Sequence, residues 1–116
     1  ISPTCVVFDV GSTKKQICDA LDQHPGRERF VAAHPLAGTE NSGPRAAFTG
    51  LFAGKTNIIC ERNRSAADAL ARVEDVFSVL GMKTLYMDAD EHDRHVAYVS
   101  HLSHVSSFLL GQTVLD

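Results

Sequence analysis

Four short apolar runs, separated by helical patterns, constrain the fold of this 116-residue chain more than any other feature. The runs are rich in β-branched and aromatic residues, as buried strands are, and they cover residues 4–8, 29–33, 56–61 and 83–87. Helical patterns follow the first and the third run, at residues 14–21 and 65–80. Strands and helices that alternate in this way predict an α/β fold.

The helix predicted over residues 65–80 has a signal at each end. Ser65 and Asp68 have the spacing of a capping box, with aspartate in place of the usual glutamate. Gly81 stands where a helix commonly ends in a left-handed residue. Apolar residues recur between these signals at intervals of three and four, at Leu70, Val73, Phe77 and Leu80. The pattern therefore predicts an amphipathic helix with one buried face.

A different pattern begins at about Asp90, where one long helix is predicted to run to the end of the chain. Asp88 or Asp90 can cap it. The C-terminal half of this helix is apolar on most sides, as helices in bundles and subunit interfaces are. We therefore expect two units, residues 1–89 and residues 90–116, and we interpret the chain as the central piece of a longer protein.

Composition and charge exclude several classes of partner. The formal net charge is -3 and the sequence has no long basic stretch, so nucleic acid is not an expected partner. No apolar run approaches the roughly 18 residues that a membrane span needs. Cys5, Cys18 and Cys60 are widely spaced and odd in number, which favours reduced thiols and a cytoplasmic protein. Cys5 and Cys60 lie in apolar runs and are predicted to be small core residues.

A dense polar stretch follows the second apolar run. It supplies an imidazole, two hydroxyls, a carboxylate and an amide, from His34, Thr39, Glu40, Asn41 and Ser42. Proline and glycine residues interrupt regular structure between them. Open α/β sheets place their chemistry outside the carboxyl ends of the strands, so we expect a functional site here. An ordinary surface loop is the alternative interpretation.

Ser12, which follows the first apolar run and Gly11, has two interpretations. It can cap the helix that follows, with Thr13 as the other candidate, or it can present a hydroxyl to a ligand at the start of that helix. The sequence contains neither a GxGxxG turn nor a GxxxxGK[ST] loop. It therefore brings no phosphate-binding turn of its own.

A second polar cluster lies on the long helix. His92 and His95, near its start, are predicted to be exposed to solvent. His101 and His104 are one turn apart among apolar neighbours, and Ser100 shares the face of His104. A buried imidazole needs a partner, and a ligand carboxylate is a suitable one. No carboxylate is in step with His101 and His104, so we expect no metal site there.

Four motifs, in this order, resemble those of the prephenate dehydrogenase family, which includes the closely similar arogenate dehydrogenases. They are DVGSTK at residues 9–14, HPLAGTENSG at 34–43, EHD at 91–93 and SHLSH at 100–104. The resemblance covers essentially the whole chain. The last motif usually reads Ser-His-Leu-Pro-His in the family, whereas Ser103 replaces the proline here. Serine leaves the helix straighter than proline would and removes no functional group.

The resemblance implies the second half of a Rossmann-like nucleotide-binding domain, with a long C-terminal helix that leads into an all-helical dimerisation domain. Family members carry a glycine-rich half before the region that begins here at Ile1. After the region that ends here at Asp116, they carry a helical domain that supplies an arginine for a substrate carboxylate. We therefore expect the complete protein to be a homodimeric enzyme, and the 116-residue piece to be inactive by itself.

The activity implied is oxidative decarboxylation of prephenate to 4-hydroxyphenylpyruvate, with hydride transfer to NAD or NADP, in tyrosine biosynthesis. By resemblance, His34 accepts the proton of the ring hydroxyl, and Ser12 bonds that centre and the nicotinamide side. Gly11 and Thr39 complete the expected cofactor contacts, while Thr39 and Glu40 line the junction with the substrate. The substrate is also expected to contact the helix that carries Ser100, His101 and His104.

Several alternatives stay open at the level of sequence. Arogenate can replace prephenate as substrate, and the residue that separates NAD from NADP lies outside this chain. Tyrosine is a candidate inhibitor. A non-catalytic module that dimerises or binds tyrosine is an alternative of another class, and a metal-binding protein is a third.

Overall fold

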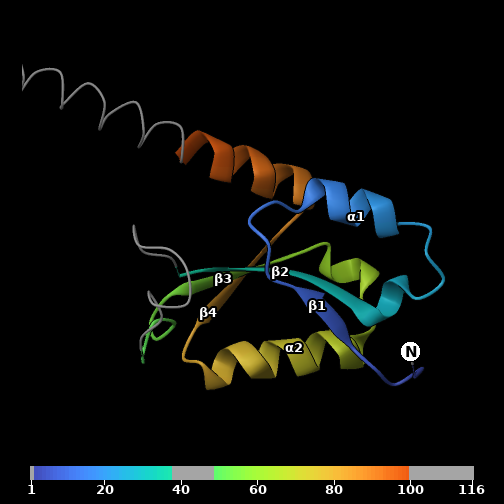
Figure 1. The fold of residues 1–116 in the computed structure, drawn as a ribbon, viewed down its shortest axis with the longest axis horizontal. Coiled ribbons are helices and arrows are strands. Elements are labelled where there is room, and N and C mark those ends of the chain that lie inside the picture. The colour runs from blue at the N-terminus through green and yellow to red at the C-terminus, as the bar shows by residue number, and fades with distance from the viewer. Residues whose placement is uncertain (1, 38–48, 100–116) are drawn as a thin grey trace, which may run out of the picture.

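The computed structural model describes residues 2–37 and 49–99, which form a four-stranded mixed sheet in the order β1-β2-β3-β4 (Figure 1). The strands are Val7–Asp9 (β1), Phe30–Leu36 (β2), Thr56–Cys60 (β3) and Lys83–Met87 (β4). β1 is parallel to β2, β2 is antiparallel to β3, and β3 is parallel to β4. The predicted α/β fold is confirmed.

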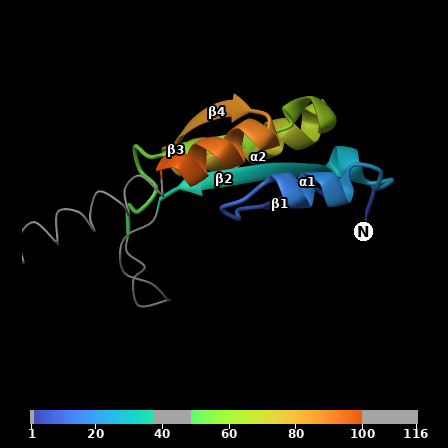
Figure 2. The same cartoon turned by 90° about the horizontal axis from the view of Figure 1, so that it is seen from above.

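Helices cover both faces of this sheet. α1 (Lys15–Leu21) follows β1 and α2 (Ala67–Val79) follows β3, and short 3-10 turns lie at Arg27–Arg29 and Arg62–Arg64. A further helix, here called the last helix, begins at residue 89 and is described as far as residue 99. α2 lies on one face, while α1 and the last helix lie together on the other (Figures 1 and 2). The result is a three-layer α/β/α arrangement.

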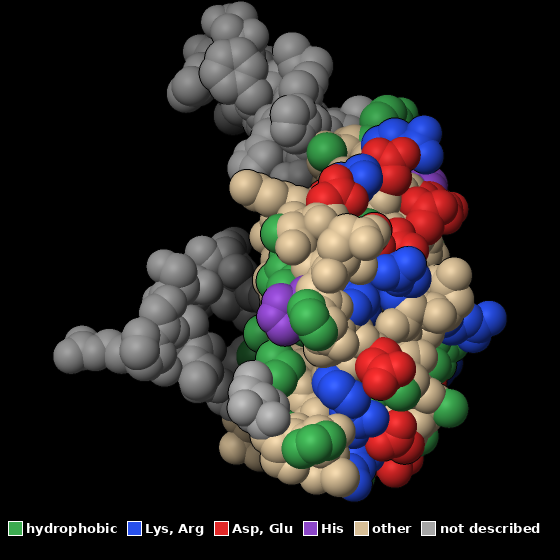
Figure 3. All heavy atoms as spheres, turned by 90° about the vertical axis from the view of Figure 1, so that its right-hand side faces the viewer, with side chains coloured by type: hydrophobic (Ala, Val, Ile, Leu, Met, Phe, Trp, Pro, Cys, Tyr) green, Lys and Arg blue, Asp and Glu red, His purple; other side chains and the backbone are tan. Residues whose placement is uncertain are grey.

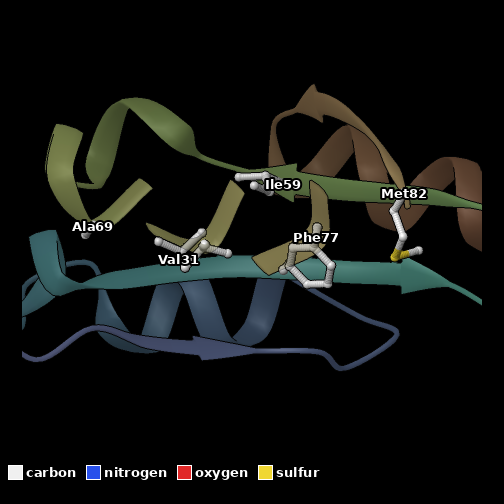
Figure 4. Close-up of a cluster of buried hydrophobic side chains, with 7 residues drawn as sticks. Val31, Ile59, Ala69, Phe77 and Met82 are labelled. Atoms are coloured by element: carbon white, nitrogen blue, oxygen red, sulfur yellow. The ribbon is translucent and has the colours of Figure 1, made fainter. Parts of the chain in front are cut away.

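Each face of the sheet has its own hydrophobic cluster, because successive side chains of a strand point to opposite faces. In β2, Val31 and Ala33 pack toward α2, whereas Phe30 and Ala32 pack toward α1 and the last helix. The cluster under α2 is completed by Ile59, Ala69, Val73, Phe77 and Met82 (Figure 4). The alternation places His34 on the side of Phe30 and Ala32.

The sequence predicted the C-terminal end of α2 correctly and its N-terminal cap wrongly. Gly81 has φ +79° and follows the C-cap Leu80, as predicted. Gly81 N–H donates to Ser78 and Met82 N–H to Phe77, which is the pattern of a Schellman motif. The predicted capping box is wrong: Ser65 Oγ lies 2.7 Å from the Phe30 carbonyl oxygen, and Asp68 pairs with Arg29 at 2.9 Å. Both side chains bind tertiary partners in place of the α2 amides.

β1 starts later than predicted, and Cys5 is exposed, so its prediction as a core residue is wrong. Arg29 explains the late start, because it donates to the carbonyl oxygens of Thr4 and Cys5 that a strand would use. Cys18 and Cys60 are buried, and burial raises the pKa of the Cys60 thiol to about 12. Cys60 therefore stays a neutral core residue, as predicted.

On the face drawn in Figure 3, basic side chains are interspersed with acidic ones. An ion pair between Arg64 and Asp22, at 2.9 Å, joins the end of α1 to the second 3-10 turn. Within residues 2–37 and 49–99, none of the helices combines the length and the hydropathy that crossing a membrane requires.

The packing of α2 predicts a matched difference between two valines. Val73 is 1% exposed in the cluster under α2, whereas Val76 is 44% exposed on the same helix. Val73→Ala leaves a cavity and should lower the free energy of unfolding by about 2 kcal/mol. Val76→Ala should change it by less than about 0.5 kcal/mol, because alanine also has the better helix propensity. Urea unfolding followed by circular dichroism measures both; equal effects would contradict this packing.

Candidate active site

His34 lies inside β2 and not in the loop after it, because the strand continues to Leu36 and pairs His34 with Ile58. Its ring is half-buried and faces the last helix. Its Nδ1 lies 2.8 Å from Nε2 of His92, which is a hydrogen-bond distance. The two rings meet edge to face, with centroids 5.1 Å apart. The strand therefore fixes His34 from one side and His92 fixes it from the other.

His92 is fully buried, so the prediction that it is exposed to solvent is wrong. Of the two predicted caps of the last helix, Asp88 and Asp90, the structure uses Asp88, whose Oδ1 accepts the N–H of Glu91 at 2.6 Å. Ala89 and His92 are three residues apart, so they share the helix face that packs on the sheet. His95 lies outside this face, and its side chain is 67% exposed.

Asp93 connects His92 to the start of α1. Its Oδ1 lies 2.7 Å from His92 Nδ1 and accepts the N–H of Lys14 at 2.8 Å, while Oδ2 accepts the N–H of Lys15 at 2.9 Å. These two amides are therefore bound by Asp93, and not by the predicted caps Ser12 or Thr13. The carboxylate comes from a residue 79 positions along the chain from Lys14. A local sequence pattern cannot reveal a cap of this kind.

Beside this carboxylate, Asp9 and Lys14 form an ion pair in which the lysine side chain is fully buried. Asp9 also accepts the N–H of Gly11 at 3.2 Å and that of Ala33 at 3.4 Å. A Cβ on Gly11 would lie 3.3 Å from Asp9 Oδ2, which is tighter than most such contacts. Asp9 thus holds the turn after β1 against β2, and Lys14 neutralises its charge.

The surroundings of His34 favour its neutral form. Burial lowers the pKa of His34, and the nearby His92 and Lys14 lower it further by electrostatic interaction, against the opposing effect of Asp9 and Asp93. His34 is therefore uncharged at neutral pH. For Asp93, burial raises the pKa of the carboxyl, but hydrogen bonds from Lys15, His92 and Lys14 outweigh burial and hold the pKa below its ordinary value.

The parallel pairing of β1 with β2 brings two predicted residues to one edge of the sheet. The last pair of the register is Asp9 with Ala32, and Gly11 and His34 each lie two residues beyond it. Gly11 and Ser12 are exposed at this edge. The carboxyl ends of parallel strands are where open α/β sheets bind their ligands. His34 and the turn at Gly11 and Ser12 are therefore brought together as a candidate site.

The other predicted site residues lie outside the described part of the chain. They are Thr39, Glu40, Ser100, His101 and His104, and their roles stay predictions. In the residues that the structure does describe, no group of three or more His, Cys, Asp or Glu side chains could hold a metal ion. One hollow in this part lies beside Leu21, Arg27 and Phe30, and His34 is not among the residues that line it.

Sequence reasoning gave no role to three residues that the structure places around His34: Asp9, His92 and Asp93. One signal was available for His92. Ala89, His92 and Val96 follow each other at intervals of three and four, so His92 lies in the buried stripe of its helix. Asp9 and Asp93 lie in two of the four motifs, but no period along the chain indicated their contacts, because their partners are brought to them by the fold.

The fold and this edge define the chain as part of an α/β nucleotide-binding domain followed by a helix. The family model for the prephenate dehydrogenase nucleotide-binding domain matches residues 1–86, and the model for the prephenate dehydrogenase dimerization domain matches residues 88–116. The chain therefore belongs to the prephenate dehydrogenase family, as the four motifs predicted.

Relatives and solved structures agree with this membership. The chain is 35% identical over 88 residues to the cyclohexadienyl dehydrogenase of Zymomonas mobilis, covering 76% of this chain and 30% of that protein. It is 34% identical, with a TM-score of 0.80, to prephenate dehydrogenase from Aquifex aeolicus in complex with hydroxyphenyl propionate and NAD+, covering 97% of this chain and 39% of that one. To arogenate dehydrogenase from Synechocystis it is 33% identical, with a TM-score of 0.77, and the match covers 97% of this chain and 40% of that one.

The buried ion pair leads to a prediction about stability. Asp9→Asn leaves the fully buried Lys14 without its counter-charge, and we expect a loss of about 3 kcal/mol in the free energy of unfolding. Adding Lys14→Met removes the uncompensated charge and should restore more than half of the loss. Chemical unfolding of the wild type, both single variants and the double variant measures the coupling. Losses that simply add would show that the pair does not stabilise this turn.

Proposed function

We propose that the protein carrying this chain oxidatively decarboxylates prephenate to 4-hydroxyphenylpyruvate and transfers a hydride to NAD or NADP. The observation that carries the proposal is the position of the half-buried His34, which is bonded to His92 and lies at the same level of the β1–β2 register as Gly11. The chain spans only 30% of the Zymomonas relative and 39% of the Aquifex structure. The activity is therefore proposed for the full-length protein.

In this reaction His34 accepts the proton of the ring hydroxyl. A general base must be unprotonated at the working pH and must come within about 2.6–3.2 Å of the proton donor. The lowered pKa of His34 meets the first condition, and the residue is only half-buried, two positions before the end of β2. The substrate carbon then loses a hydride and the ring carboxylate leaves as carbon dioxide, which makes the ring aromatic.

The residues at this edge fit the nicotinamide end of a dinucleotide. Gly11 and Ser12 are exposed there, and the missing side chain of Gly11 leaves the turn open next to Asp9. Asp93 accepts the N–H groups of Lys14 and Lys15, so these two amides are not available to a ligand phosphate. We therefore propose that Gly11, Ser12 and Thr39 contact the nicotinamide, which accepts the hydride when it is bound.

The remaining assignments follow the motifs. We propose that Thr39 and Glu40 line the junction between cofactor and substrate, and that Ser100, His101 and His104 contact the substrate. We also propose that residues 1–89 belong to the nucleotide-binding domain and residues 90–116 to a helical domain through which two subunits associate. The match of residues 88–116 to the dimerization domain supports this association.

Replacing His34 tests the proposal. In the full-length protein, His34→Asn should lower kcat by roughly 10²–10⁴-fold and leave the KM for prephenate nearly unchanged, because the acid–base group is removed. In the wild type, kcat/KM should fall as acid protonates His34, with a midpoint below the ordinary pKa of histidine because burial lowers this pKa. A variant with the wild-type kcat would remove His34 from the mechanism.

Arogenate is the second candidate substrate, and the similarity to Synechocystis arogenate dehydrogenase favours its inclusion. Prephenate and arogenate differ in one side chain, at the end remote from the ring hydroxyl, so His34 serves either substrate equally. Steady-state turnover of each with NAD+ and with NADP+ separates the four combinations. We expect His34→Asn to lower kcat by the same factor for both substrates. A decrease in kcat confined to one of them would show that His34 selects the substrate.

A further inference from the structure

We propose that His92 and Asp93 are positioning residues that hold the His34 ring with its Nε2 lone pair free to accept a proton. The inference rests on the proposed function, in which His34 is the base. It begins from geometry: three groups form a continuous chain, with 2.8 Å between His34 Nδ1 and His92 Nε2 and 2.7 Å between His92 Nδ1 and Asp93 Oδ1.

The direction of the hydrogen bonds follows from the chemistry of the last group. An ionised carboxylate can only accept, so His92 must present a proton on Nδ1 to Asp93. The opposite tautomer would set a ring lone pair against a carboxylate lone pair at 2.7 Å. With one proton on the ring of His92, its Nε2 is then an acceptor, and His34 must donate from Nδ1. The lone pair of His34 is consequently on Nε2, the nitrogen left for the substrate.

Backbone contacts make this arrangement rigid. Besides His92, the Asp93 carboxylate accepts two main-chain N–H groups, from Lys14 and Lys15, so it cannot rotate without leaving both amides unpaired. His92 is fully buried, and water cannot take over its bonds. This series of hydrogen bonds therefore connects His34 in β2, through the last helix, to the start of α1.

The same hydrogen bonds also hold His34 in its protonated state. When Nε2 of His34 takes the proton from the substrate oxygen, the ring becomes an imidazolium that still donates from Nδ1 to His92. The negative charges of Asp93 and Asp9 face this cation and favour it, while the positive charge of Lys14 opposes it. Asp93 acts on His34 through His92 and does not contact the substrate in this role.

Kinetics of matched variants in the full-length protein test the inference. His92→Asn and Asp93→Asn should each lower kcat by about 10–100-fold, the usual effect of removing a group that orients a reacting one. The KM for prephenate should change less than about twofold. His95→Asn, on an exposed histidine of the same helix, should keep the wild-type kcat. In Asp93→Asn the acid limb of kcat/KM should also move to lower pH, because a charge that raises the pKa of His34 is lost.

Nitrogen-15 NMR of labelled histidines gives a readout that a merely structural role would not move. In the wild type at neutral pH, His34 should show a protonated Nδ1 and a free Nε2. In Asp93→Asn the amide can face His92 with its NH₂ group, which reverses the tautomer of His92 and then that of His34. A wild-type His34 protonated on Nε2 at neutral pH would overturn the inference, whatever the variants do.

The outcomes separate this inference from the proposed function. If His34→Asn keeps full activity, the proposed function fails. If His34→Asn is slow while His92→Asn and Asp93→Asn turn over at the wild-type rate, the proposed function stands and the positioning role is overturned. Asp93→Asn also weakens the start of α1 and can unfold. His92→Asn keeps both backbone bonds of Asp93 and then decides the question, with the wild-type tautomer as an independent measurement.

Discussion

The carboxylate of Asp93 joins the three elements on one side of the sheet. It accepts hydrogen bonds from the N–H groups of Lys14 and Lys15 at the start of α1. It also bonds to His92, which in turn bonds to His34 in β2. Without it, the part-buried N–H of Lys14 and the buried ring of His92 would both lack a partner, at a cost of about 1–3 kcal/mol for each group. The position of the last helix on the sheet and the orientation of His34 therefore depend on one side chain.

The two faces of the sheet consequently differ in character. The face under α2 is closed by an apolar cluster that includes Val31, Ile59 and Phe77. The opposite face combines an apolar cluster around Phe30 with the polar chain from His34 to Asp93. Hydrophobic packing tolerates small shifts of one element on another, whereas hydrogen bonds of 2.7–2.9 Å do not. The polar face is thus suited to hold a reacting group, and the apolar face supplies stability.

Much of the fold was readable from local pattern. Alternating apolar runs predicted the strands, a period of three to four residues predicted α2, and Gly81 ended α2 as expected because a left-handed residue is needed there. Polar side chains were less predictable. Ser65 and Asp68 had the spacing of a capping box, yet they bind Phe30 and Arg29, partners that only the fold brings next to them.

By itself, the sequence determined the α/β class, the family and the candidate base His34, because strand periodicity and short motifs are local properties of the chain. The tertiary structure alone decided that His34 lies within β2, that His92 is buried and that Asp93 binds the N–H of Lys14, 79 positions earlier, at the start of α1. These features depend on which groups meet across the fold. Distances in space, unlike periods along a chain, arise only once the elements have packed.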